Sequence, residues 1–170
     1  VIPRDEPWNR PLFAAVHRLN GNGELTGTHW IAESGQLTSY IGLTNTHSVG
    51  VVHDALIAYE HRVRGGGEFF FALPVVGETY DGILNDVNGF HVKPEHVEAA
   101  IAAAAAGPVP EGVVGSGTGM ICHGYKGGIG TASRVVGDYT VGVLVQANHG
   151  VRERLTIDGV PVGRLLPAPP

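Results

Sequence analysis

The stretch FFFALPVVGETYDG, residues 69–82, joins an apolar run to a polar end. A strand that is apolar at nearly every position is typically buried on both faces, and proline interrupts a sheet because it has no N–H to donate. We therefore expect a buried strand over Phe69–Val76 that ends near Pro74, with Glu78 just beyond its end.

Two shorter strands are expected on the N-terminal side of this stretch. Leu12–Leu19 and Thr38–Thr44 are rich in apolar and strand-forming residues. Asn20–Gly23 lies between them and suits the positive backbone angles of a turn. The pattern predicts two strands with a polar turn in the connection.

Two helices are predicted, one before and one after the quoted stretch. Ser48 is a good N-cap, Gly65–Gly67 closes the helix, and the apolar residues between them follow helical spacing: Val49, Val52, Leu56, Tyr59 and Val63. Pro94 suits the first turn of a second helix, which an alanine-rich run carries to Gly107.

Two hairpins are predicted in the last third of the chain. Thr131–Val136 and Tyr139–Asn148 are separated by a Gly-Asp turn, and Asn148 ends the second strand. Leu155–Ile157 and Val160–Val162 are separated by an Asp-Gly turn. Strands before and after two helices favour an α+β fold in which helices cover layers of sheet. A length of 170 residues, 43% of them hydrophobic, predicts one domain over residues 1–170.

The composition argues against several classes of partner. Only 16% of the residues are charged and the net charge is -5, so no basic surface is expected for nucleic acid. No apolar stretch reaches the roughly 20 residues that cross a bilayer, and the start has no signal-peptide layout, so we expect no membrane partner. The compartment stays open.

Metal and nucleotide sites are not predicted. The single cysteine, Cys122, excludes an internal disulfide, and its apolar neighbours favour a small buried hydrophobe over a nucleophile. Gly115–Gly119 lacks the Lys-Ser/Thr ending of a phosphate-binding loop. Neither HExxH nor a zinc-finger spacing occurs among His17, His29, His47, His53, His61, His91, His96, His123 and His149. We expect no metal and no other cofactor.

Polar residues at two element ends are candidates for a site. Glu78, Tyr80 and Asp81 follow the predicted buried strand, where a carboxylate and a phenol could bind an amine and a developing oxyanion. The Asn148 amide would also suit an oxyanion hole. In both places the alternative is a solvated turn. Three further polar clusters carry the same two interpretations: Asn20–Glu24, Thr44–His47 and Asn85–Gly89.

Five ordered stretches resemble the P1 family, S58, of N-terminal-nucleophile-like peptidases, which includes the L-aminopeptidase D-amidase/esterases and the β-peptidyl aminopeptidases. They are Leu19–Gly27, Thr44–Gly50, Leu73–Gly82, Gly117–Cys122 and Val145–Asn148.

The resemblance implies a four-layer αββα sandwich and a precursor that cuts itself before a serine. The serine then begins a β chain and acts as nucleophile, while the α chain stays bound to it. We expect this chain to be most of the α chain, without its N-terminal segment and without the β chain. Its start at Val1 and its proline-rich end agree with a processed piece.

The resemblance also implies roles for residues of this chain, none of which is the nucleophile. Glu78 would pair with the substrate's free amino group, and Tyr80 and Asn148 would donate to the oxyanion. Phe71 and Trp30 would line the side-chain pocket. The implied activity is an aminopeptidase or amidase acting on short peptides, amides or esters. The implied assembly is a homo-oligomer, a tetramer, of αβ units.

Other activities remain open on the same scaffold. Ornithine acetyltransferases resemble this family and use a threonine nucleophile for acyl transfer. A branch that cleaves linear synthetic amide oligomers is also similar. An inactive binding module would follow if no serine stood at the cleavage point. The sequence does not choose among L-, D- and β-amino-acid substrates.

Overall fold

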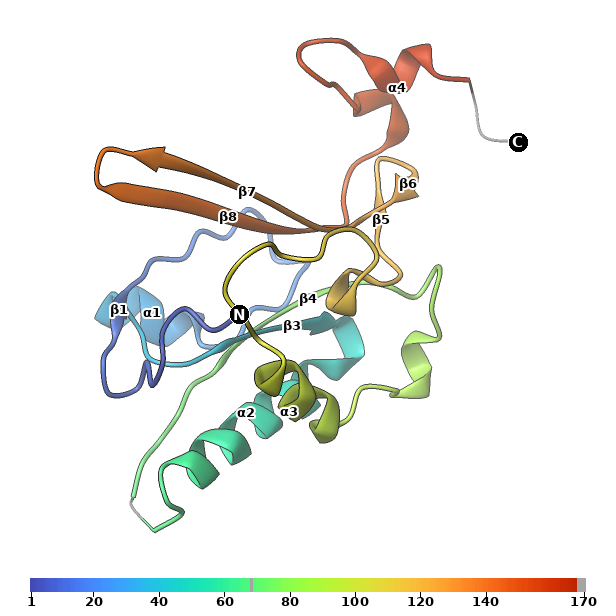
Figure 1. Ribbon diagram of the computed structural model, residues 1–170. Coiled ribbons are helices and arrows are strands. Elements are labelled where there is room, and N and C mark those ends of the chain that lie inside the picture. Colours follow the sequence, from blue (N-terminus) through green and yellow to red (C-terminus); the bar gives the residue numbers. More distant parts are fainter. Residues whose placement is uncertain (68, 168–170) are drawn as a thin grey trace. The chain divides into compact units, whose positions relative to one another are not determined.

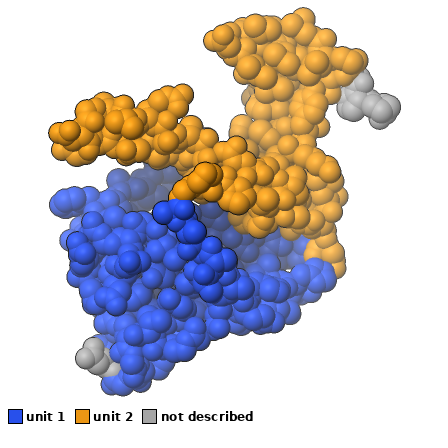
Figure 2. Space-filling view, in the orientation of Figure 1, with its two compact units in different colours: residues 1–79, 87–106 blue, residues 80–86, 107–170 orange. Residues whose placement is uncertain are grey.

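The computed structural model describes residues 1–67 and 69–167 and divides into two compact units (Figure 2). The first comprises residues 1–79 and 87–106, and the second comprises residues 80–86 and the chain from 107 onward. None of the helices in these described residues combines the length and apolar character needed to cross a bilayer. The proline-rich end, where cleavage is expected nearby, lies partly outside the described residues.

The chain contains both helices and strands, and the four strands of its last third follow one another with no α-helix between them, which agrees with the α+β class (Figure 1). The α-helices are α1 (Thr28–Ser34), α2 (Val49–Val63), α3 (Pro94–Ala102) and α4 (Val162–Leu165). The strands are β1 (Leu12–Phe13), β2 (Gln36–Leu37), β3 (Ile41–Asn45), β4 (Val75–Thr79), β5 (Ile121–Cys122), β6 (Tyr125–Lys126), β7 (Gly128–Val136) and β8 (Tyr139–Ala147).

The first unit is organised around the parallel pair β3 and β4. Their register runs from Ile41 opposite Val75 to Asn45 opposite Thr79. Parallel neighbours need a crossover connection, and α2 supplies it between the two strands. Both strands therefore end on the same edge, where polar residues follow β3 and close β4.

Strand β4 is buried on both faces, as its apolar sequence predicts. Successive strand residues point to opposite sides. Val76 belongs to a core cluster formed with α2 and α3, whereas Val75 belongs to a separate cluster with Ile31 and Leu37. Two cores thus fix the strand that carries Glu78.

The predicted bounds of this strand are wrong. The strand begins after Pro74 instead of ending there, and it includes Glu78 within Val75–Thr79. Phe69 and Phe71 lie outside it and are 97% and 69% exposed. Proline has no N–H to donate within a sheet, but it is tolerated where a strand begins. The prediction took Pro74 as the end of the strand, whereas Pro74 stands just before its start.

Other boundaries also differ from the sequence-based expectations. The strand expected over Leu12–Leu19 contains only two residues, and α1 was not predicted because it is short and has no side-chain cap. Helix α3 ends at Ala102, short of Gly107. Helix α2 begins after Ser48 and ends at Val63, before the glycines, as predicted, although the Ser48 side chain makes no capping hydrogen bond.

The second unit contains a long antiparallel ribbon. β7 and β8 pair from Gly128 opposite Ala147 to Val136 opposite Tyr139, which confirms the predicted hairpin. The later hairpin is reduced to one bridge between Ile157 and Val160, because α4 begins where its second strand was expected.

Candidate functional site

Glu78 is held at the end of β4 by two neutral donors from different segments. Its Oε1 accepts a hydrogen bond from the Glu24 N–H at 2.9 Å, and its Oε2 accepts one from the Thr46 hydroxyl. Thr46 follows β3, which ends beside β4, and a second bond joins the Glu78 N–H to the Glu24 carbonyl at 3.3 Å. The side chain is half-buried.

This arrangement leaves binding capacity on the carboxylate. An ionised carboxylate has about four acceptor positions, of which these two donors use one on each oxygen. Neutral donors orient the carboxylate without cancelling its charge. Glu78 can therefore accept charge-assisted hydrogen bonds from an ammonium group.

Two polar clusters thus turn out to support Glu78. Asn20–Glu24 contributes the Glu24 main chain, and Thr44–His47 contributes the Thr46 hydroxyl. Sequence reasoning noted both clusters but assigned them no partner. The parallel pairing of β3 with β4 indicates the contact with the Thr44–His47 cluster, because Thr44 lies opposite Glu78 in the register.

Asn148 lies directly after β8 in the second unit, with both ends of its amide engaged. Oδ1 accepts from the Ile121 N–H at 2.9 Å, and Nδ2 donates to the Tyr80 carbonyl oxygen at 2.9 Å. A primary amide has two N–H donors. One hydrogen on Nδ2 therefore remains for a further acceptor in a fixed direction. Sequence reasoning missed Ile121, whose contribution comes from the main chain.

Tyr80 begins the second unit, and its ring lies over Gly82. A Cβ placed on Gly82 would lie 2.4 Å from the phenol oxygen and 2.6 Å from Cζ. Any larger residue at 82 would displace the ring. Tyr80 is 52% exposed. One hydrogen bond joins the Asn148 side chain to the Tyr80 main chain, and it does not involve the Tyr80 hydroxyl.

Asp81 and Asn85 stabilise the turn that follows Tyr80. Asp81 is 4% exposed and its Oδ2 accepts from Asn85 Nδ2 at 3.0 Å, while the same amide reaches the Thr118 carbonyl at 3.2 Å. A Cβ on Gly119 would collide with the Asn85 amide at 2.3 Å. The polar cluster at Asn85 therefore supports the turn rather than a separate site.

The two predicted pocket residues are in contact. The rings of Trp30 in α1 and Phe71 lie edge to face with centroids 6.3 Å apart. Phe71 is 69% exposed, so the pair presents apolar surface rather than a closed pocket.

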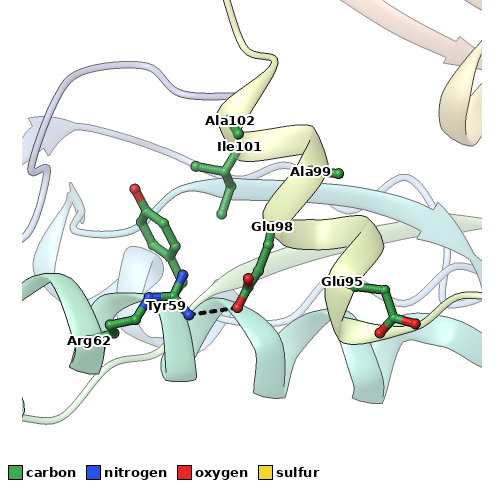
Figure 3. A pocket seen from close by; sticks show the side chains of 7 residues that line it. All are labelled: Tyr59, Arg62, Glu95, Glu98, Ala99, Ile101 and Ala102. Atoms are coloured by element: carbon green, nitrogen blue, oxygen red, sulfur yellow. Dashed lines mark hydrogen bonds and ion pairs between the residues drawn. The ribbon is translucent and has the colours of Figure 1, made fainter.

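A separate open groove of about 480 Å³ lies between α2 and α3 (Figure 3). Arg62 and Glu98 form an ion pair across it at 2.7 Å. The other lining residues are Tyr59, Glu95, Ala99, Ile101 and Ala102. No predicted site residue lines this groove, and its ion pair serves to join the two helices.

Comparison with known proteins assigns the chain to a family. The sequence model of Peptidase family S58 matches residues 1–169. The chain belongs to peptidase family S58.

Two curated relatives of this S58 chain are β-peptidyl aminopeptidases named BapA. The protein from Sphingosinicella microcystinivorans is 54% identical over 170 residues, which cover 98% of the S58 chain and 42% of the relative. The protein from Sphingosinicella xenopeptidilytica is 52% identical over 151 residues, which cover 86% and 38% respectively. The S58 chain thus spans about two fifths of these relatives.

Solved structures show the same fold. A Burkholderia sp. β-aminopeptidase matches with a TM-score of 0.90 and 58% identity, over 95% of the S58 chain and 46% of that chain. The L-aminopeptidase D-Ala-esterase/amidase of Ochrobactrum anthropi matches with a TM-score of 0.88 and 51% identity, over 92% and 45%. The latter is described as a prototype for the serine aminopeptidases and as a new variant among the Ntn hydrolase fold.

Proposed function

We propose that this chain is the larger, α-chain portion of a self-processing serine aminopeptidase, which releases N-terminal residues from short peptides, amides or esters. The observation that carries the proposal is the Glu78 carboxylate, oriented by the Glu24 N–H and the Thr46 hydroxyl at the end of a strand buried on both faces. Membership of peptidase family S58 supports the reaction class.

In this proposal Glu78 binds the substrate's free ammonium group. The charge-assisted contact selects substrates with an unblocked amino end and fixes which amide reaches the nucleophile. An N-acylated substrate has no positive charge to offer. Selectivity for a free amine follows from this single carboxylate.

Asn148 and Tyr80 serve as donors to the oxyanion. The second hydrogen of Asn148 Nδ2 and the Tyr80 hydroxyl would bind the carbonyl oxygen as it gains negative charge. The bonds to Ile121 and to the Tyr80 carbonyl fix the amide before substrate arrives. Preorganised donors of this kind need no rearrangement in the transition state.

The nucleophile is a serine at the start of a separate β chain. Its hydroxyl attacks the amide carbonyl, and its own free amine takes the proton and passes it to the leaving amine. Water then hydrolyses the resulting acyl-enzyme, and the same donors bind the oxyanion that forms in this step. Trp30 and Phe71 would contact the substrate side chain.

The β7–β8 ribbon supports the need for a second chain. Residues at alternate positions share one face, and on this face five apolar side chains are exposed: Val136, Tyr139, Val141, Val143 and Val145. Apart from one bridge between Gly112 and Ile129, the ribbon pairs with no other strand in residues 1–67 and 69–167. A lone two-stranded ribbon is marginally stable in water.

The β chain would add strands to this ribbon and cover its apolar face. Such pairing would complete a four-layer αββα sandwich in which residues 1–170 belong to one domain with the β chain. A tetramer of αβ units is the assembly we expect. The share of the relatives that this chain spans leaves ample length for the β chain.

The relatives favour β-amino-acid substrates for the first assays. The two curated relatives and the Burkholderia structure are named for β-peptidyl or β-amino activity. The Ochrobactrum enzyme, named for L-aminopeptidase and D-Ala-esterase/amidase activity, is 51% identical, so both classes need testing. The family assignment favours hydrolysis over acyl transfer.

The full-length gene product tests the proposal directly. We would purify it, measure the intact masses of its components, and sequence the N-terminus of the smaller one. A second chain beginning with serine, together with hydrolysis of amino-acid amides, would support the peptidase. A threonine start would indicate acyl transfer. An uncut precursor would reduce the family likeness to a shared scaffold.

A further inference from the structure

Three potential metal ligands converge in the second unit, at the ends of two different strands. Cys122 ends β5, His123 follows it, and His149 follows β8 by two residues. The Cys122 sulfur and one ring nitrogen from each histidine lie within 4.8 Å of one another. His149 comes from a distant part of the sequence, so ligand spacing gave no signal.

The separations fit a single small divalent ion. Tetrahedral zinc binds sulfur at about 2.3 Å and nitrogen at about 2.0–2.1 Å, which places two such ligand atoms about 3.5 Å apart. Cys122 Sγ and His149 Nε2 are 3.6 Å apart. The other two separations are at most 4.8 Å, and because the His123 ring is held in place, the Cys122 and His149 side chains would close them by turning toward it.

The main chain around His123 is shaped to hold its ring. His123 has a φ of 52°, in the left-handed region that costs free energy for a residue with a Cβ, and its N–H bonds to the His149 carbonyl at 2.8 Å. A Cβ on Gly150 would lie 2.4 Å from His123 Cε1 and 2.5 Å from Nδ1. Glycine at 150 therefore gives the ring its place.

A hydrogen bond fixes which nitrogen of His123 is basic. Nδ1 lies 3.0 Å from the Val151 carbonyl oxygen, which can only accept, so Nδ1 carries the hydrogen. The lone pair is then on Nε2. Histidines that bind metals usually donate their other ring N–H to such a carbonyl, which orients the ring.

We propose that Cys122, His123 and His149 form a binding site for one divalent ion of the zinc class. The thiol S–H bond breaks as the sulfur–metal bond forms, and the proton passes to solvent. Two imidazoles and a thiolate suit a borderline-soft ion better than magnesium or calcium. The fourth position is open to water, and because His149 is exposed the site can exchange its ion with solvent.

The ion would also join the two segments that position Asn148. The N–H of Ile121, one residue before the sulfur ligand Cys122, donates to the Asn148 side chain. His149 directly follows Asn148 in the sequence. Metal binding would therefore restrain the end of β8 against β5.

The test uses the complete processed protein, freed of metal with a chelator and titrated with Co²⁺ as a spectroscopic substitute for zinc. We expect one equivalent to produce a thiolate-to-cobalt charge-transfer band and visible bands of tetrahedral intensity, all displaced by one equivalent of Zn²⁺. Mass spectrometry of the Cys122 peptide should show slower alkylation when zinc is bound.

Variants assign the ligands. Cys122→Ser should abolish the charge-transfer band, and His123→Gln or His149→Gln should each weaken Co²⁺ binding at least ~10-fold. Gly150→Ala removes no ligand, yet it should weaken binding similarly by displacing the His123 ring. His29→Gln, at an exposed histidine of α1, is the matched control and should bind as the unmodified protein does.

Circular dichroism shows whether each variant is folded. Absence of the charge-transfer band in the unmodified protein, or unchanged binding by Cys122→Ser, would overturn the site. Such a result would leave only a thiol–imidazole contact and adventitious binding by surface histidines.

Discussion

Asn148 Nδ2 donates a hydrogen bond to the main-chain carbonyl oxygen of Tyr80 across 2.9 Å. The amide that we assign to the oxyanion is thus aligned by the same residue that offers the second donor. Its orientation depends on main-chain groups, which side-chain substitutions elsewhere leave in place.

Replacing Asn148 with aspartate keeps the shape but removes both N–H donors. We expect kcat of the processed enzyme to fall by ~10²–10³, the usual cost of one oxyanion donor, with a smaller change in KM. Steady-state kinetics on an amino-acid amide measures this. Asn88→Asp, at an exposed asparagine, should retain normal kcat. Equal losses in the two variants would exclude a specific role for Asn148.

Glu78→Gln removes the charge while keeping most of the side-chain volume. We expect the preference for a free amino group over its N-acetylated analogue to disappear, because the neutral amide no longer favours an ammonium. The ratio of kcat/KM for the two substrates is the measurement. The control is Glu95→Gln, at an exposed glutamate on α3. A preserved ratio in Glu78→Gln would assign amine recognition to another residue.

Gly82→Ala tests the position of the Tyr80 ring. The added methyl would lie 2.4 Å from the phenol oxygen, so the ring must move away. We expect lower kcat with little loss of stability, since the end of an exposed side chain can shift cheaply. Gly50→Ala in α2 meets no atom within 4 Å and should keep kcat. An unchanged kcat in Gly82→Ala would argue against Tyr80 as a donor.

Val143→Asp places a charge on the apolar face of the β7–β8 ribbon. If the β chain covers this face, the buried charge should reduce self-cleavage and association of the two chains. Gel electrophoresis and size-exclusion chromatography of the expressed precursor measure both. Thr140→Asp, on the opposite face of the same strand, is the matched control. Normal processing of Val143→Asp would show that this face stays exposed.

Glu60 in α2 provides a pH-dependent prediction. Burial raises the pKa of its carboxyl, while the hydrogen bond and charge of Arg64, 2.8 Å away, oppose the rise. A carboxyl whose pKa is raised in the folded state makes its full contribution to stability at pH values below its unfolded-state pKa. This contribution is lost as the pH rises through the pKa of the folded state.

Glu60→Gln stays neutral at every pH, so its stability relative to the unmodified protein should increase as the pH rises from about 4 to about 7. Thermal unfolding of the processed protein across that range measures the difference. Glu95→Gln is again the control and should show no such trend. A pH-independent difference at position 60 would contradict the predicted effect of burial.

The sequence predicts elements well where local signals agree. Ser48 before a helical repeat, with glycines after it, predicts α2 because the cap, the period and the stop indicate one helix. The Gly-Asp turn between alternating strands predicts β7 and β8 for a similar reason. Helix α1 has seven residues between two glycines and no cap, so its stability depends on packing that a local pattern does not reveal.

The candidate site is less accessible from sequence. Glu78, Tyr80 and Asn148 were candidates because they lie at element ends, and a family resemblance implied their roles. Part of their support comes from main-chain groups of Glu24 and Ile121. Backbone donors have no residue-specific signature. The contact of Trp30 with Phe71 likewise depends on the position of a helix that was not predicted.

The burial of β4 on both faces has a practical meaning for redesign. Val75 and Val76 belong to different cores, yet the packing of both determines the position and direction of the Glu78 side chain. Mutant libraries that vary these two valines would change folding and amine recognition together and confuse the two effects. Loop positions around Glu24 and Thr46 permit separate adjustment, so engineering of substrate scope belongs there.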